Sequence, residues 1–171
     1  MAMSMSNAQI VEGCRRRDAK AQRALYDATA PMALGVCMRY AANRDEAQDL
    51  MQDAYIKVFE RIGQLRDADR LEAWVYSIMV NTGVQHCRKA HRETVVDDLE
   101  PVASAVDFDP YSAHDLVAAM QQLSPRHRLA FNLFAVEGYS LDEVAQQMKC
   151  SNVNVRVMLN RARNKMREFL R

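Results

Sequence analysis

The segment from Ser140 to Leu170 carries the side chains best suited to contacting a nucleic acid. Ser140 and Glu143 have the spacing of a capping box, which predicts a short helix that ends near Met148. The tight turn Lys149-Cys150-Ser151 follows, with Ser151 as the cap of a longer basic helix. A short helix, a turn and a basic helix predict a helix-turn-helix, whose second helix lies in the major groove of DNA.

Helical phase divides this last helix into two sides. If Val155, Leu159 and Ala162 face inward, the opposite side can enter the groove. Asn and Arg form paired hydrogen bonds with adenine and guanine edges, and an exposed valine suits the methyl group of thymine. Two alternatives stay open: a solvated face for Arg163–Arg167, and a contact with the other domain for Val153 and Val157. The residues predicted to face outward or to flank that side are Val153, Asn154, Arg156, Val157, Asn160 and Arg161.

A second polar surface is predicted on the helix that opens at Asp45. Apolar residues recur there at three- and four-residue steps as far as Ile62, which predicts an amphipathic helix. Its polar side is locally acidic, and a simple solvated face is the alternative to a binding role. The residues predicted on that side are Asp45, Asp49, Gln52, Asp53 and Lys57.

Charge divides the 171-residue chain into three parts. Residues 93–122 contain seven acidic side chains and no Lys or Arg, whereas the flanking parts are net basic. This pattern predicts two domains, 1–92 and 112–171, joined by an acidic linker over 93–111. A single domain with an acidic loop is the alternative. The basic balance of both flanks points to a polyanionic partner.

Every strong periodicity in the chain is helical, so we predict an all-α protein made of two small helical domains, the second a helix-turn-helix. Asn7 and Asp18 are predicted to cap the first two helices. A long helix is predicted from Leu71 to about His91. Two later helix starts are predicted where a cap precedes proline, at Asp109-Pro110 and at Ser124-Pro125.

Several function classes are disfavoured by composition. No run of about 18 apolar residues and no signal-like start occurs, so we expect neither membrane insertion nor secretion. The four cysteines are scattered and the four histidines have no metal-ligand spacing, so we expect no metal, no cofactor and a reducing cytoplasm. No nucleophile, base and orienting group stand at a recognisable spacing, which argues against an enzyme.

The order of three segments resembles bacterial RNA polymerase sigma factors of the sigma-70 family. Residues 45–59 are similar to the helix that binds the core polymerase, and residues 71–81 are similar to the helix that melts the promoter. Segments 123–128, 137–145 and 161–163 are similar to the block that binds the upstream element. Because a short linker alone separates the blocks, the layout is that of the extracytoplasmic-function group. The resemblance covers about residues 8–92 and 112–171.

The resemblance implies a sigma factor that binds core RNA polymerase, recognises promoter DNA and promotes strand opening, with an anti-sigma factor as a further partner. It implies polymerase contacts at Asp49, Gln52 and Asp53. It implies contacts with the minus-ten strand, one base of which is flipped into a pocket, at Asn81, Arg88, Lys89 and Arg92. The resemblance assigns the minus-thirty-five element to the last block, and helical phase supplies the residues there. Base contacts are predicted from Asn154, Arg156, Val157 and Asn160, and mainly phosphate contacts from Arg161 and Arg163, with Ser151 at the start of the helix.

The last block departs from the family pattern. Lys149 stands where a turn glycine is usual, and residues 153–158 read Val-Asn-Val-Arg-Val-Met in place of Gly-Thr-Val-Lys-Ser-Arg. A lysine in a left-handed turn costs roughly 1 kcal/mol, and the alternative is a turn of another shape. Two rival interpretations stay open: a conventional helix-turn-helix regulator that binds duplex operators without polymerase, and a sigma-like adaptor that no longer reads DNA.

Overall fold

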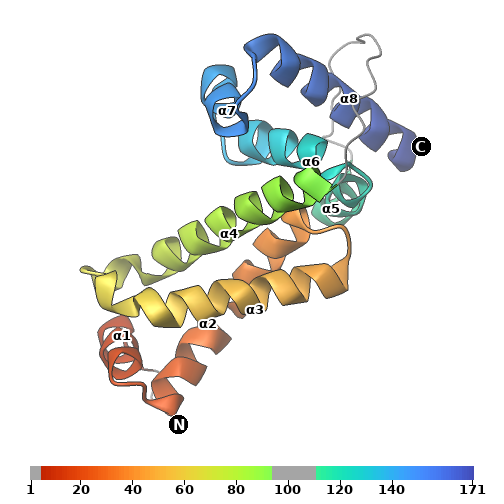
Figure 1. Ribbon diagram of the computed structural model, residues 1–171. Helices are drawn as coiled ribbons and strands as arrows, with labels where there is room; N and C mark the ends of the chain where they lie inside the picture. Colours follow the sequence, from red (N-terminus) through yellow and green to blue (C-terminus); the bar gives the residue numbers. More distant parts are fainter. Residues whose placement is uncertain (1–4, 94–110) are drawn as a thin grey trace. The chain divides into compact units, whose positions relative to one another are not determined.

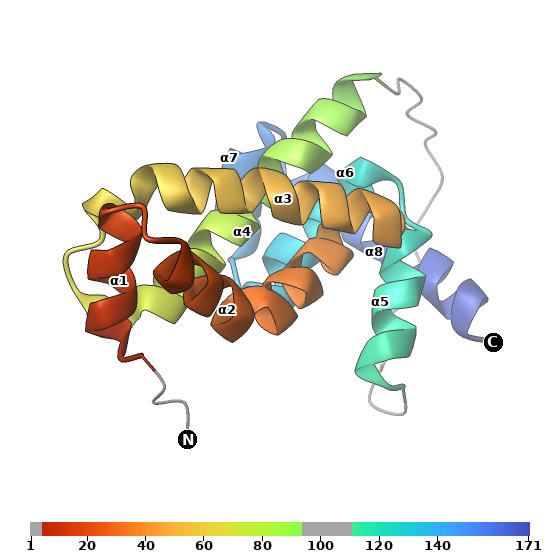
Figure 2. The same cartoon turned by 90° about the horizontal axis from the view of Figure 1, so that it is seen from below.

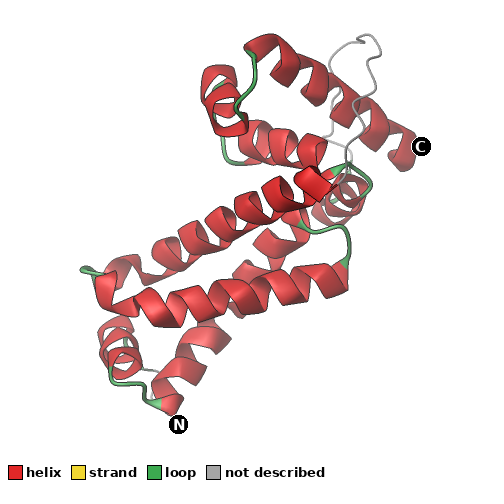
Figure 3. Ribbon diagram, in the orientation of Figure 1, coloured by secondary structure: helices red, strands yellow, loops and turns green. Residues whose placement is uncertain are grey.

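The computed structural model describes residues 5–93 and 111–171, and within these residues every regular element is helical (Figures 1 and 3). The predicted all-α class is confirmed. None of the described helices is both long and apolar enough to cross a membrane. The elements are α1 Asn7–Arg15, α2 Ala19–Tyr40, α3 Arg44–Arg61, η1 Ile62–Gln64, η2 Ala68–Arg70, α4 Leu71–Glu93, α5 Ala113–Gln121, α6 Pro125–Phe131, η3 Asn132–Val136, α7 Leu141–Met148 and α8 Asn152–Leu170.

The described chain forms two compact units. The first contains residues up to 37 and residues 45–83, and the second contains residues 38–44 and those from 84 onward. The division falls inside α2 and α4, so each of these two helices contributes residues to both units.

The first two helices of the first unit begin at polar caps. The cap of α1 is Ser6, whose hydroxyl accepts a hydrogen bond from the Gln9 backbone N–H, while the Gln9 side-chain oxygen accepts one from the Ser6 backbone N–H. The prediction of Asn7 as this cap was wrong by one position. Asp18 caps α2 as predicted, because its carboxylate accepts from the Ala21 N–H at 2.8 Å. Gly13 lets the two helices approach, since a Cβ there would lie 2.4 Å from that of Ala21.

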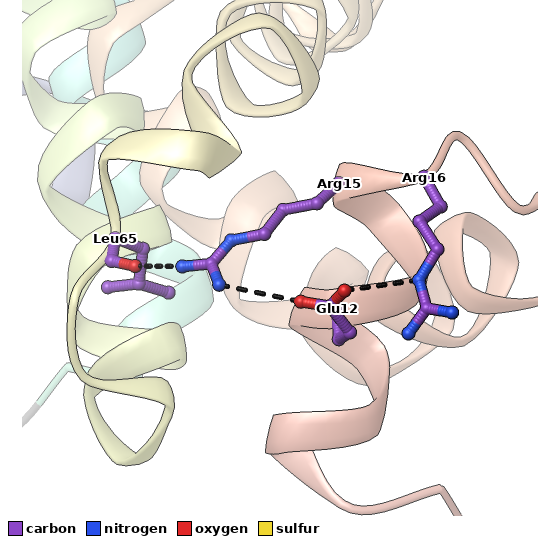
Figure 4. Close-up of polar contacts among 4 residues, drawn as sticks. All are labelled: Glu12, Arg15, Arg16 and Leu65. Carbon is purple, nitrogen blue, oxygen red and sulfur yellow. Dashed lines mark hydrogen bonds and ion pairs between the residues drawn. The ribbon is translucent and has the colours of Figure 1, made fainter.

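Polar contacts fix α1 to the turn that follows α3 (Figure 4). Arg15 donates to the Leu65 carbonyl at 2.6 Å and pairs with Glu12 at 3.5 Å. Glu12 also accepts from Arg16 at 3.1 Å. Leu65 itself is buried. The guanidinium of Arg15 therefore joins the first helix to a backbone carbonyl far along the chain.

The core of the first unit is built from the apolar stripes that the sequence predicts. On α3 the buried residues recur at helical spacing from Ala47 to Val58, and on α4 Val75 and Met79 are fully buried. Thr29 and Tyr55 satisfy each other inside this core, with their hydroxyl oxygens 2.7 Å apart. Burial raises the pKa of Tyr55 above its usual value, although the hydrogen bond with Thr29 opposes this. The polar side of α3 is therefore held outward by a packed apolar side.

In the second unit, α8 packs against α5, α6 and α7, and α5 lies beside its C-terminal half (Figure 2). Ser112 caps α5 with a reciprocal hydrogen bond to Asp115, whereas the predicted start at Asp109-Pro110 lies outside the described residues. Ser124 caps α6 with Pro125 in its first turn, as predicted. The packing of α8 against α5 and α6 buries Met166 in an apolar cluster, and Leu170 packs against the same cluster.

The end of α6 widens into one π-helical turn, η3. The Glu137 N–H donates to the Asn132 carbonyl at 2.9 Å, a span of five residues in place of four. Gly138 then adopts φ +76° and ends the helix, as its type and position predict. The sequence gives no signal for the wide turn.

Candidate nucleic-acid interface

The helix-turn-helix forms where the sequence predicts it. Ser140 caps α7, and its N–H and hydroxyl each donate to Glu143 at 2.8 Å. Lys149 ends α7 in the left-handed conformation, at φ +51° and ψ +47°. Ser151 then caps α8 by accepting from the Asn154 N–H at 3.2 Å. The lysine therefore occupies the strained turn position.

The capping carboxylate makes this motif sensitive to acid. Hydrogen bonds from the Ser140 backbone and hydroxyl lower the pKa of Glu143. Because the folded pKa is depressed, the stabilisation is present above the unfolded pKa and is lost as the pH falls through the folded one. We expect Glu143→Gln to lower the melting temperature at pH 7, and the gap from wild type to close below the folded pKa. Thermal unfolding across pH measures this, with the exposed Glu168→Gln as control.

The exposure of α8 follows the predicted phase. Val155, Leu159 and Ala162 are buried, and Met158 joins them. Val153 is 68% exposed, and Asn154 and Arg156 are also exposed. Ser151 is exposed at the cap, whereas four further predicted contact residues are half-buried: Val157, Asn160, Arg161 and Arg163.

An open groove borders the exposed side of α8. Phe134 and Leu141 line it from the preceding elements, and Val153, Val157 and Leu159 line it from α8. Polar side chains complete the lining, among them Arg163, whose guanidinium carbon lies 6.0 Å from the centre of the Phe134 ring. The two valines therefore face a groove and not the core.

A side-chain relay joins the first turns of α7 and α8. The Asn152 amide nitrogen donates to Asp142 at 2.6 Å, and its amide oxygen accepts from Arg156 Nε at 3.2 Å. A role for Asp142 or Asn152 was not predicted from the sequence. The available signal for this contact was the spacing of Asn152 and Arg156, two polar residues one helical turn apart.

The structure places the three predicted polymerase contacts together on α3. Asp49, Gln52 and Asp53 are exposed, and Gln52 and Asp53 follow Asp49 by three and four residues, about one helical turn. Among the described residues, none of the three is in an ion pair or a side-chain hydrogen bond. Ile56, one turn further on, is 56% exposed and extends the same face. The surface is therefore a row of unpaired polar groups ending in an apolar side chain.

The predicted minus-ten residues lie on α4. Asn81 is exposed, and no partner within the described part of the chain hydrogen-bonds to its amide. Arg88 is half-buried and donates to the Gln147 side chain at 2.8 Å, while Lys89 is exposed. Arg92 belongs to the last turn, and its side chain is outside what the structure describes.

A buried arginine, Arg128, organises the second unit, and its burial was not predicted from the sequence. Arg128 is 3% exposed and donates to the carbonyls of Met120, Gln121 and Leu123 at 3.2, 3.2 and 2.7 Å, and to that of Tyr40 at 3.1 Å. Asn132, one turn later, donates to the Arg39 and Arg128 carbonyls. The available signal was the four-residue spacing of Arg128 and Asn132, which stand on either side of the apolar run Leu129–Phe131.

Comparison with known families gives two matches in chain order. Residues 25–93 match sigma-70 region 2, and residues 113–166 match sigma-70 region 4. Among curated proteins, the chain is 31% identical to the RNA polymerase sigma factor CarQ of Myxococcus xanthus, with 85% of this chain and 87% of that protein covered. It is 28% identical to the RNA polymerase sigma-H factor of Pseudomonas aeruginosa, with 91% and 89% covered.

Another relative is the ECF RNA polymerase sigma factor EcfG of Rhodopseudomonas palustris, 27% identical over 84% of this chain and 81% of that protein. Among solved structures, the sigma factor RpoE in complex with the anti-sigma factor NepR from Bartonella quintana superposes with a TM-score of 0.48 and 25% identity. That superposition covers 85% of this chain and 93% of the other.

Proposed function

Because this chain belongs to the extracytoplasmic-function group of the sigma-70 family, we propose that its three polar surfaces divide the work of promoter recognition. The protein is a sigma factor, which binds core RNA polymerase, recognises promoter DNA and promotes strand opening. It is not itself an enzyme. Residues 1–92 act as the domain for polymerase and the minus-ten element, residues 112–171 act on the minus-thirty-five element, and residues 93–111 link them.

The polymerase contact is assigned to Asp49, Gln52 and Asp53. The observation that carries the proposal is their shared exposed face, on which neither Asp49 nor Asp53 forms an ion pair with any described residue. An acidic face on an otherwise basic domain suits a basic protein surface and repels DNA phosphates. A conventional operator-binding regulator has no need of such a face.

The minus-ten strand is assigned to α4. The exposed Asn81 amide can both donate to and accept from a base edge. Arg88, Lys89 and Arg92 follow it along the helix and would hold the strand through its phosphates. In this assignment Asn81 recognises a base, and the basic residues that follow it add affinity for the strand.

The upstream duplex is assigned to the exposed side of α8. Asn154, Arg156, Val157 and Asn160 would meet base edges, and Arg161 and Arg163 phosphates, with Ser151 at the helix start. Val153 presents the most exposed apolar surface of this helix to the groove, which suits a thymine methyl group.

Transcription in vitro with purified core polymerase tests this function. We expect specific run-off transcripts when both proteins are present, and weak binding of promoter duplex by the free chain. Tight operator-like binding of duplex DNA without polymerase would instead support a conventional regulator. Polymerase binding without promoter preference would support the adaptor.

Replacing Asn81 tests the minus-ten assignment separately. We expect Asn81→Ala to lower open-complex formation on duplex promoters about tenfold, because a base edge loses its paired amide, while polymerase binding is unchanged. Permanganate footprinting of melted thymines measures opening, and Gln64→Ala removes an exposed amide elsewhere in the first unit as control. Wild-type opening by Asn81→Ala would return Asn81 to a structural role.

Regulation and location complete the proposal. We assign the protein to the cytoplasm, where its four free cysteines suit a reducing compartment. An anti-sigma factor is the expected regulator. A surface that it covers could no longer bind polymerase or DNA. Co-purification of the tagged chain from cells before and after stress measures that partner.

A further inference from the structure

The relay from Asp142 through Asn152 to Arg156 connects the two helices of the helix-turn-helix outside its core. Asp142 lies in the first turn of α7, and Asn152 is the first residue of α8. The two contacts, at 2.6 and 3.2 Å, are both made at the surface. A relay this exposed adds little to stability, so its purpose lies in what it positions.

The chemistry of Asp142 and Arg156 determines the orientation of the Asn152 side-chain amide between them. A carboxylate only accepts hydrogen bonds, and a guanidinium only donates them. The Asn152 nitrogen must therefore face Asp142, and its oxygen must face Arg156. Asparagine can satisfy both neighbours at once because its amide carries a donor and an acceptor.

The relay occupies one edge of the Arg156 guanidinium. Nε is engaged, and among the described residues no partner contacts the two Nη groups. Those two groups form the end of the planar fork that pairs with guanine O6 and N7. Arg156 is exposed and lines the groove beside Val153, on the side of α8 that can enter DNA.

We propose that Asp142 and Asn152 are positioning residues that hold Arg156 ready to read one guanine of the upstream element. This rests on the proposed role of α8 in reading duplex DNA. An arginine that is already ordered loses less side-chain freedom on binding, which is worth about two- to tenfold in preference for the correct base. The relay residues themselves touch no base.

Selection from duplexes randomised in the upstream element, with holoenzyme assembled from core polymerase, tests the proposal. We expect wild type to prefer guanine at one position and Arg156→Ala to lose that preference. Asn152→Ala and Asp142→Ala should each reduce it about two- to tenfold at the same position and no other. Asp142→Asn should restore it, because its amide oxygen can accept from Asn152.

The controls separate positioning from folding. Gln146→Ala removes an exposed polar side chain of α7 outside the relay and should select as wild type does. Arg163→Ala should weaken all sequences alike and flatten the salt dependence. If Asn152→Ala keeps the full guanine preference, or loses preference at every position, the proposed positioning role of Asp142 and Asn152 is wrong. The proposed role of α8 in reading DNA is unaffected by either result. If wild type selects no upstream sequence, the role of α8 fails first and the relay with it.

Discussion

Reversing the charge of Asp53 is expected to weaken binding to core RNA polymerase by about thirtyfold or more. The carboxylate is exposed on α3, next to Asp49 and Gln52, and has no cationic partner within the described residues. Asp53→Lys would place like charges opposite one another in the complex, which costs more than losing a single contact. Titration of fluorescently labelled protein with core polymerase measures the affinity.

The matched control for this change is Asp69→Lys. It makes the same charge reversal in the same unit, on η2, where Asp69 is exposed and away from α3. We expect it to bind polymerase as wild type does. A folded Asp53→Lys protein with unchanged affinity would show that the acidic face of α3 is not the docking surface.

Removing the guanidinium of Arg128 is expected to destabilise the second unit by about 3 kcal/mol or more. Arg128→Met keeps the apolar stem of the side chain but removes the guanidinium, and it leaves four carbonyls without this donor, those of Tyr40, Met120, Gln121 and Leu123. Breaking a buried charged network is among the costlier single changes. Urea unfolding followed by circular dichroism measures the loss.

Lys165→Met is the comparison for Arg128→Met, because it deletes one positive charge from an exposed site on α8. Its effect should stay within about 0.5 kcal/mol, as for most surface substitutions. Equal stability of the Arg128→Met and Lys165→Met proteins would mean that water satisfies the carbonyls and that the buried arginine is dispensable.

Local signals in the sequence were sufficient for most of the helix-turn-helix. Ser140 and Glu143 hydrogen-bond to each other, and Ser151 caps α8 by bonding to a residue three positions away. Both caps can therefore be predicted from neighbouring residues alone. Val155, Leu159 and Ala162 recur at helical spacing, so the buried side of α8 also follows from neighbours in sequence. The outward side is then fixed by elimination.

Features that depend on distant partners could not be predicted in this way. Arg128 is basic and would be placed at the surface, but backbone carbonyls from α5 and from Tyr40 surround it. The cap of α1 is a different case because its signal is local: Ser6 and Gln9 have the spacing of a capping box and exchange hydrogen bonds, so Ser6 is the cap in place of the predicted Asn7.

The π turn at η3 sets the rotational register of everything that follows α6. Five residues fill a turn that an α-helix closes with four, and each residue advances a helix by about 100°. Deleting one residue from Asn132–Val136 would regularise the helix, yet it would turn Glu137 away from Arg39, with which it pairs at 3.0 Å. Gly138 and the cap of α7 would turn with it. A one-residue deletion in this turn would therefore re-aim the whole helix-turn-helix, although each of its helices would keep its own sequence.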